Sequence, residues 1–211
     1  MPRITEERRT ARRAKIVAAA RRCFSRDGFH QTSMPDIAAE AGVSTGAPYR
    51  YFAGKDDIIA EIAGDAFHMI FEPLERAVEH GDALTVPDLI RASVSRASEA
   101  VTIDAAGQPV PVEELLRCAV QAWAELLRND ALRAQASAGF EAMRERMAQS
   151  LRRGKEAGIV AVGLDVDRAT RVVMALLHGF VLQRTAFGLV DPHGFLDDVD
   201  LVFAEVGMPA R

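Results

Sequence analysis

Apolar residues recur every three or four positions along most of the chain, the spacing of helices that bury one face. The clearest stripe contains the apolar positions 112, 115, 116, 119, 123, 126 and 127. Glycine and proline punctuate the pattern, and runs of alternating β-branched residues, which would indicate strands, are nearly absent. The pattern therefore predicts an all-α protein with about nine helices and no sheet.

Helix start and stop signals divide this pattern into segments. We expect helices at 10–26, 33–42, 44–52, 56–80, 88–103, 112–127, 129–158, 165–188 and 193–206. The first three are short and suggest an N-terminal domain of residues 1–55, which extends to about residue 70 through the linking helix. Residues 56–211 then form a helical bundle. Pro73 lies inside the linking helix, where it removes a backbone hydrogen bond and should kink the helix.

Charge is distributed unevenly between these two parts. Residues 1–55 carry 11 Lys and Arg against 5 Asp and Glu, whereas residues 56–211 carry 15 and 25. A basic N-terminal part suits a polyanion, and an acidic remainder would be repelled by one. A solvated basic helix face is the alternative interpretation of the charge alone. The acidic remainder argues against a nonspecific nucleoid-type DNA binder, which would be basic throughout.

Several classes of function lack their sequence signals. Cys23 and Cys118 are far apart and match no metal spacing, so we expect reduced thiols in a cytoplasmic protein with no metal and no cofactor. No apolar run approaches the roughly 20 residues that cross a membrane. The chain also has no glycine-rich phosphate loop, no nucleophile elbow and no His/Cys/carboxylate cluster, and we therefore expect that it is not an enzyme.

The strongest functional signal is the segment 32–52, which reads as helix, tight turn and helix. Gly42 can adopt the left-handed conformation that the turn needs. Small or apolar residues occupy the positions where two short helices must cross, and Phe52 is expected in the core. The exposed positions between them are small, hydroxyl-bearing or aromatic, which is typical of a recognition helix in the major groove of double-stranded DNA.

Residues 12–60 closely resemble the head of TetR/AcrR-type transcription regulators. The resemblance is carried by Gly42-Val43-Ser44 and by Tyr49-Arg50-Tyr51-Phe52 with Lys55 three residues on. It implies that Ser33 caps the second helix and contacts a phosphate. It places Ser44, Thr45, Gly46 and Ala47 at the start of the recognition helix, facing bases and backbone. Tyr49, Tyr51 and Lys55 would reach phosphates, Lys55 with the help of the helix dipole.

Two features of this head lie outside the shared motif. Pro48 stands where the family often has leucine or isoleucine, and at the fourth position of the expected helix we interpret it as tolerated. The basic N-terminus either lies in an adjacent minor groove or is a solvated terminus. Its arginines are Arg3, Arg8, Arg9, Arg12 and Arg13.

The second part, over about 112–190, resembles more loosely the C-terminal domain of the BetI-like branch. Segments 168–187 and 193–206 are more apolar than one chain of this size can cover, which favours a homodimer through the last two long helices and a near-palindromic operator. The resemblance implies a repressor released by a small-molecule effector. A protein partner, or redox chemistry at Cys118, is the alternative signal.

A pocket between helices of the bundle is the expected effector site. Its candidate lining residues are also plausible core residues, and the sequence leaves both interpretations open. They are Phe67, Phe71, Cys118, Trp123, Phe140 and Met143.

Overall fold

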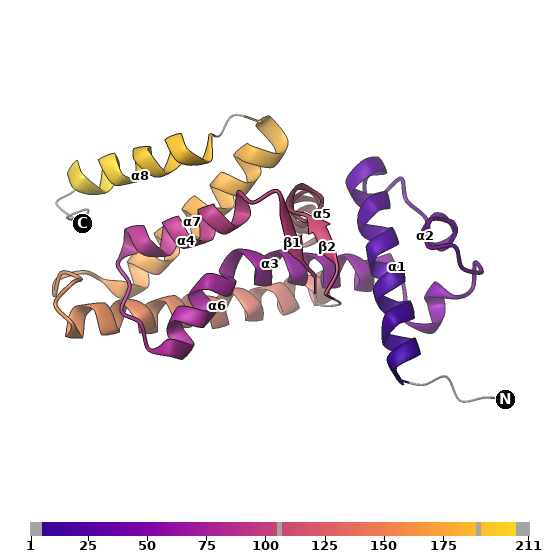
Figure 1. Cartoon of the computed structure of the whole chain (residues 1–211), viewed down its shortest axis with the longest axis horizontal. Helices are drawn as coiled ribbons and strands as arrows, with labels where there is room; N and C mark the ends of the chain where they lie inside the picture. Colours follow the sequence, from indigo (N-terminus) through magenta and orange to yellow (C-terminus); the bar gives the residue numbers. More distant parts are fainter. Residues whose placement is uncertain (1–5, 105–106, 189–190, 206–211) are drawn as a thin grey trace. The chain divides into compact units, whose positions relative to one another are not determined.

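Eight α-helices make up most of the computed structural model, which describes residues 6–104, 107–188 and 191–205 (Figure 1). They are α1 (Glu6–Asp27), α2 (Met34–Glu40), α3 (Lys55–His80), α4 (Val86–Ala97), α5 (Val112–Glu125), α6 (Asp130–Glu156), α7 (Val166–Leu182) and α8 (Pro192–Glu205). A 3-10 turn η1 (Pro48–Arg50) and a π turn η2 (Gln183–Phe187) complete the helical elements. The predicted helical fold class is confirmed. In the described part of the chain, no helix is long and apolar enough to span a bilayer.

A short antiparallel strand pair interrupts the helices, and the prediction of no sheet was wrong. Strand β1 (Val101–Ile103) pairs with β2 (Pro109–Pro111), with Thr102 opposite Val110. The helix expected at 88–103 ends at Ala97, because the β-branched run 101–103 favours an extended backbone and the prolines of β2 cannot continue a helix. Thr102 and Val110 are buried, while their neighbours in each strand are exposed.

The helix expected at 44–52 is also absent as an α-helix. Only Pro48–Arg50 is helical, and its hydrogen bonds are the shorter 3-10 type, such as Arg50 N–H to the Ala47 carbonyl at 3.1 Å. Pro48 has no N–H to donate to the Ser44 carbonyl four residues back. That carbonyl instead accepts from Ala47 N–H at 2.8 Å. Pro48 therefore shortens the helix in which we expected it to be tolerated.

Packing divides the chain into two compact units. Unit 1 contains the described residues up to Phe67 together with Ala100–Arg133, and unit 2 contains His68–Glu99 together with those from Ala134 onward. Helix α3 contributes its first half to unit 1 and its second half to unit 2. The division at residue 55, expected from the pattern of helices, stays a prediction.

The core of unit 1 gathers α1, α2, the start of α3, β2 and α5 around one apolar cluster. Ile16, Phe24, Ile58 and Leu115 are among its fully buried members. A buried charge lies beside this cluster: Arg21 of α1 has its Nε 3.3 Å from Glu114 of α5 and its Nη1 3.7 Å from Asp104. A buried guanidinium is stable only when it is paired, so these contacts help to fix α1 against α5.

In unit 2, α4 packs against both α7 and α8 (Figure 1). Leu89 and Ile90 of α4 and Val173 and Leu177 of α7 are almost completely buried. Helix α6 carries a separate close approach at Gly154. A Cβ at this position would lie 2.6 Å from Val160 Cγ2 and 2.9 Å from the Leu84 carbonyl oxygen.

We therefore expect Gly154→Ala to lower the free energy of unfolding by about 1–3 kcal/mol, because the new methyl group meets backbone that cannot move aside. Gly139→Ala is the matched control, since Gly139 lies on the same helix with nothing within 4 Å of an added Cβ. The control should raise stability by up to about 1 kcal/mol through helix propensity. Urea unfolding of both variants measures the difference, and equal stabilities would contradict the packing described for α6.

Candidate nucleic-acid interface and ligand pocket

The first helix of the helix-turn-helix is fixed at both ends by local hydrogen bonds. Ser33 is the N-cap of α2, and its hydroxyl accepts from the Asp36 N–H at 3.3 Å. The Asp36 carboxylate accepts in return from Ser33 N–H at 2.8 Å and from its hydroxyl at 2.5 Å. These bonds hold the pKa of Asp36 below its usual value, because they stabilise the charged form. The predicted cap is confirmed, and the phosphate contact of Ser33 stays a prediction.

Gly42 forms the turn, as expected, with a φ of +60°. The chain reverses there, and Val43 N–H donates to the Ala38 carbonyl at 3.0 Å. A left-handed residue is needed because α2 stops and the next segment must cross it closely.

The predicted base-facing residues separate into exposed and buried ones. Ser44, Thr45 and Gly46 are exposed, and Tyr49 is 57% exposed. Ala47 is only 8% exposed and faces the core, so the exposed patch does not include it. Removing an apolar tyrosine face from water is favourable, and a tyrosine left in solvent beside a turn is therefore available to a partner.

Tyr51 and Phe52 point the other way. Tyr51 is half-buried against the unit 1 cluster, and Phe52 is buried as predicted. The guanidinium carbon of Arg13 lies 4.8 Å from the centre of the Phe52 ring, a cation–π contact. The expected phosphate contact of Tyr51 would have to be made from the exposed part of its side chain.

Lys55 is the first residue of α3, and its ammonium already has protein partners. Its Nζ donates to the Phe29 carbonyl at 2.8 Å and lies 4.6 Å from the centre of the Phe29 ring. Asp57 accepts from Ala53 N–H at 2.8 Å, and Asp56 lies in the same first turn. These two carboxylates offset the positive end of the helix dipole, so a phosphate here would depend on the Lys55 charge itself.

Five exposed cations of the head have no ion pair among the residues that the structure describes, and the half-buried Lys55 is a sixth. Arg50 lies inside the motif Tyr49-Arg50-Tyr51-Phe52 and Lys15 lies outside it, and neither was predicted to contact DNA. A Cβ placed on Gly42 would lie 3.8 Å from the Lys15 ammonium, so Lys15 reaches the turn. The five are Arg8, Arg9, Arg12, Lys15 and Arg50, and all are exposed.

Most of the N-terminal arginines lie on a helix. Helix α1 begins at Glu6, four residues before the expected start, so Arg8 to Arg13 lie in its first turns. Arg13 forms an ion pair with Glu61 of α3. Arg3 lies outside the described residues.

The six predicted effector residues are divided between the two units, and a common site for them stays a prediction. Phe67, Cys118 and Trp123 belong to unit 1, whereas Phe71, Phe140 and Met143 belong to unit 2. Cys118, Phe71 and Met143 are buried in their cores, at 0%, 3% and 2% exposure. Only Phe140 lines the cavity described next.

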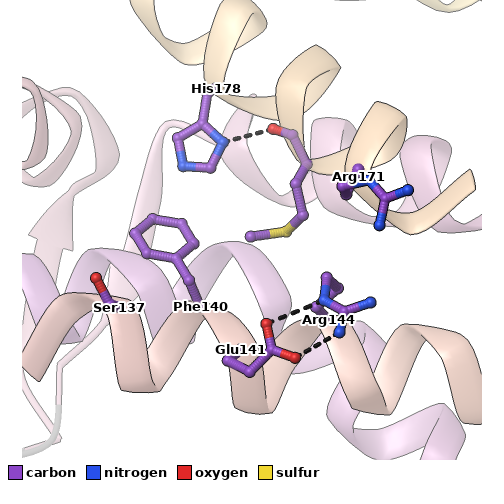
Figure 2. Close-up of a pocket in the computed structure, with 7 residues that line it drawn as sticks. Ser137, Phe140, Glu141, Arg144, Arg171 and His178 are labelled. Atoms are coloured by element: carbon purple, nitrogen blue, oxygen red, sulfur yellow. Dashed lines mark hydrogen bonds and ion pairs between the residues drawn. The ribbon is translucent and has the colours of Figure 1, made fainter. Parts of the chain in front are cut away.

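That cavity is an open hollow of about 310 Å³ between α6 and α7. Figure 2 shows Phe140 of α6 facing His178 of α7, with ring centroids 4.9 Å apart, and Arg171 and Arg144 farther along the hollow. The lining residues share one face of each helix. They are Ser137, Phe140, Glu141 and Arg144 on α6 and Arg171, Met174 and His178 on α7.

The polar groups of the hollow differ in their partners. Arg144 is held by Glu141 and by Asp167, to which its Nη1 donates at 3.1 Å. The His178 Nδ1 is 2.5 Å from the Met174 carbonyl, so it carries the proton, and burial lowers the pKa of the imidazole. The neutral ring therefore presents Nε2 as an acceptor. Polar residues spaced i, i+3, i+4 around Phe140 on α6 are the sequence signal that could have indicated this hollow.

Within the described residues, no group of three or more His, Cys, Asp or Glu side chains could hold a metal ion. Both thiols are buried and free. Burial raises the pKa of Cys118 to about 12, and it also raises the pKa of Cys23. The thiolate is the reactive form, so neither environment suits a redox sensor.

A capped helix, a glycine turn and an exposed hydroxyl- and tyrosine-bearing segment define a helix-turn-helix DNA-binding regulator. The family described as "Bacterial regulatory proteins, tetR family" matches residues 16–62, and "BetI-type transcriptional repressor, C-terminal" matches residues 86–196. The chain therefore belongs to the TetR family of transcriptional regulators, with a BetI-type C-terminal part.

Relatives agree over most of the chain. The HTH-type transcriptional regulator YfiR of Bacillus subtilis is 28% identical over 160 residues, 74% of this chain and 72% of its own. The structure of SmeT, described as the repressor of a Stenotrophomonas maltophilia multidrug efflux pump, is 26% identical with a TM-score of 0.67, covering 92% and 89%. A Saccharomonospora viridis regulator solved with choline is 19% identical with a TM-score of 0.71, covering 92% and 96%, and shares the fold.

The buried thiols lead to a prediction for chemical reactivity. In the folded protein at about pH 8, neither cysteine should react with a thiol-specific disulfide reagent, because both pKa values are raised and both sulfurs are covered. Protection should fade only as the pH approaches 12 for Cys118. Absorbance of the released thiol measures the reaction, and Cys23→Ser separates the two sites. Fast reaction of native Cys118 would instead favour the redox alternative.

Proposed function

We propose that this TetR-family regulator is a dimeric repressor that binds a near-palindromic operator and leaves it when a small molecule binds unit 2. The observation that carries the DNA-binding part is a set of exposed residues that follows the glycine turn, with Lys15 beside the turn. They are Ser44, Thr45, Gly46, Tyr49 and Arg50. The proposal assigns DNA binding to residues 1–55 and sensing and dimerisation to residues 56–211. Its site of action would be the cytoplasm, where a bacterial chromosome lies.

In this proposal, some of these exposed side chains contact bases and others contact phosphates. Thr45 and Ser44 have short hydroxyl-bearing side chains that can meet base edges in the major groove. Tyr49, Arg50 and Lys55 supply a hydroxyl and two positive charges for phosphates, which fix register without reading sequence. The 3-10 geometry of η1 makes the segment short, so base contacts would come from the turn before Pro48.

Dimerisation is supported by apolar side chains that unit 2 leaves in solvent. Val172 and Leu182 on α7 are 52% and 39% exposed, and Leu201 and Val202 on α8 are 62% and 59% exposed. Large apolar groups left exposed on two helices of one unit favour a partner surface. A second copy of the chain would bury them by a two-fold contact and would bring a second DNA-binding head.

The hollow between α6 and α7 is the effector site that we propose. Phe140 and Met174 offer apolar surface, Arg171 has no ion pair among the described residues, and the volume lies near the lower end of ordinary ligand pockets. The regulator solved with choline supports a small molecule as signal in this fold, without naming the ligand here. Pro73 in α3, the helix shared by both units, is the proposed point of bending during the response.

The DNA contacts predict a specific loss of affinity. Tyr49→Ala and Arg50→Ala should each weaken binding about tenfold or more, since each removes a phosphate contact worth roughly 1.4 kcal/mol. Arg50→Ala should also lower the dependence of log K on log salt by about one unit. Fluorescence anisotropy on the DNA upstream of the protein's own gene, at several salt concentrations, measures both effects.

Arg168→Ala is the charge-matched control, because its side chain is 80% exposed on α7 in unit 2. It should leave affinity and salt dependence unchanged. If Tyr49→Ala and Arg50→Ala bound as tightly as the unchanged protein, the proposed interface would be wrong. If no DNA were bound specifically, at this promoter or in a genome-wide selection, the proposal would fail as a whole.

The dimer predicts a sensitivity to charge on α8. Leu201→Asp should raise the dimer dissociation constant about tenfold or more, because a carboxylate would be buried without a partner. Leu127→Asp is the control, since Leu127 is 82% exposed at the end of α5 in unit 1 and should tolerate the charge. Sedimentation velocity over a concentration series measures the constants. A monomeric parent protein, or an unaffected Leu201→Asp dimer, would contradict this arrangement.

A further inference from the structure

Gln121 of α5 makes two hydrogen bonds to the backbone where α1 ends. Its Nε2 donates to the Phe24 carbonyl at 2.9 Å, and its Oε1 accepts from the Phe29 N–H at 2.6 Å. All three residues belong to unit 1, although Gln121 is more than 90 residues away in sequence. A single amide thus bridges the two ends of the segment Phe24–Phe29, which we call the corner between α1 and α2.

The corner needs such a partner because the helix leaves backbone groups unpaired. Helix α1 ends at Asp27, and Gly28 reverses the chain with a φ of +90°. Gly28 N–H donates to the Phe24 carbonyl at 3.0 Å, and that carbonyl has a second lone pair for another donor. The next N–H, of Phe29, donates to the Gln121 side chain. An amide carries both the donor and the acceptor that these two groups require.

The carbonyl of Phe29, which belongs to the next peptide group, is held by Lys55. The Phe29 carbonyl accepts from the Lys55 ammonium at 2.8 Å, and the same ammonium lies over the Phe29 ring. Phe29 is only 6% exposed and packs against Phe24, with ring centroids 5.3 Å apart. Phe29 is therefore fixed by Gln121 through its N–H and in turn fixes Lys55 through its C=O.

We propose that Gln121 is a positioning residue for DNA binding, which sets the place of the Lys55 ammonium through the backbone of Phe29. The inference rests on the proposed phosphate contact of Lys55. Lysine has a long, flexible side chain whose ordering costs free energy. Because a fixed carbonyl and ring already hold its ammonium, less of that cost falls on the binding step.

A second contact of α5 with the same corner lies one helical turn further on. Glu125 Oε1 is 2.9 Å from His30 Nε2, and Glu125 is buried. Residues 121 and 125 share a face of α5, so that face contacts both Phe29 and His30. Helix α5 therefore holds the segment before α2 at two points, Phe29 and His30.

A double-mutant cycle between Gln121 and Lys55 tests the inference. Lys55→Ala should weaken binding to the tightest duplex selected from random DNA about tenfold, with a salt slope smaller by about one. Gln121→Ala should weaken binding several-fold with a partial loss of slope, although it removes no charge. The double variant should bind no more weakly than Lys55→Ala alone, because Gln121 acts through Lys55.

Gln149→Ala, an exposed glutamine of α6 in unit 2, is the matched control and should change neither quantity. If Gln121→Ala does not fold, as judged by thermal unfolding, Gln121→Glu replaces it, since a carboxylate keeps the acceptor for Phe29 N–H and loses the donor to Phe24. It should show the same non-additivity with Lys55→Ala.

Two results would overturn the inference, and they are distinguishable. Fully additive losses with an unchanged salt slope for the Gln121 variant would show that Gln121 supports only the fold. If Lys55→Ala had no effect on binding, the proposed phosphate contact of Lys55 would be wrong, and the inference with it. Specific DNA binding by the unchanged protein would in that case still support the proposed function.

Discussion

Burial of the apolar face of α1 is the constraint on which the DNA-binding end of this protein depends. Ile16, Ala20 and Phe24 are completely buried, and burying each large side chain contributes about 1.5–3 kcal/mol. The helix-turn-helix covers only part of that face, and α5 covers another part. The DNA-binding head is therefore not a free-standing three-helix domain, since a segment almost 100 residues away completes its core.

This shared core decides which groups remain for DNA. Ala47, Pro48 and Phe52 are buried, so Thr45, Tyr49 and Arg50 remain outside. Other arginines of α1, such as Arg22 and Arg26, already form ion pairs with Glu40. The unpaired cations gather at the start of α1 and around the turn, and a polyanion is attracted there while most of the acidic residues lie in the rest of the chain.

Sequence reasoning succeeded where the cause is local. Ser33, Gly42 and the long amphipathic helices follow from capping, turn geometry and spacing, which neighbouring residues decide. It failed where the outcome depends on one missing N–H, as at Pro48, or on pairing across a loop, as between Thr102 and Val110. The contacts of Gln121 and the hollow at Phe140 join distant segments, and spacing along one helix cannot reveal them. Cys118 and Met143 belong to the apolar stripes of their helices, and both are buried in the core.

We propose that a two-fold dimer presents two such heads to DNA. Selection of bound duplexes from a random library, followed by footprinting at known stoichiometry, tests it most directly. We expect a near-palindromic sequence with half-sites separated by about one helical turn or a multiple of it, occupied by an even number of chains. A single asymmetric site bound by one chain, or no enriched sequence from a folded protein, would contradict the account.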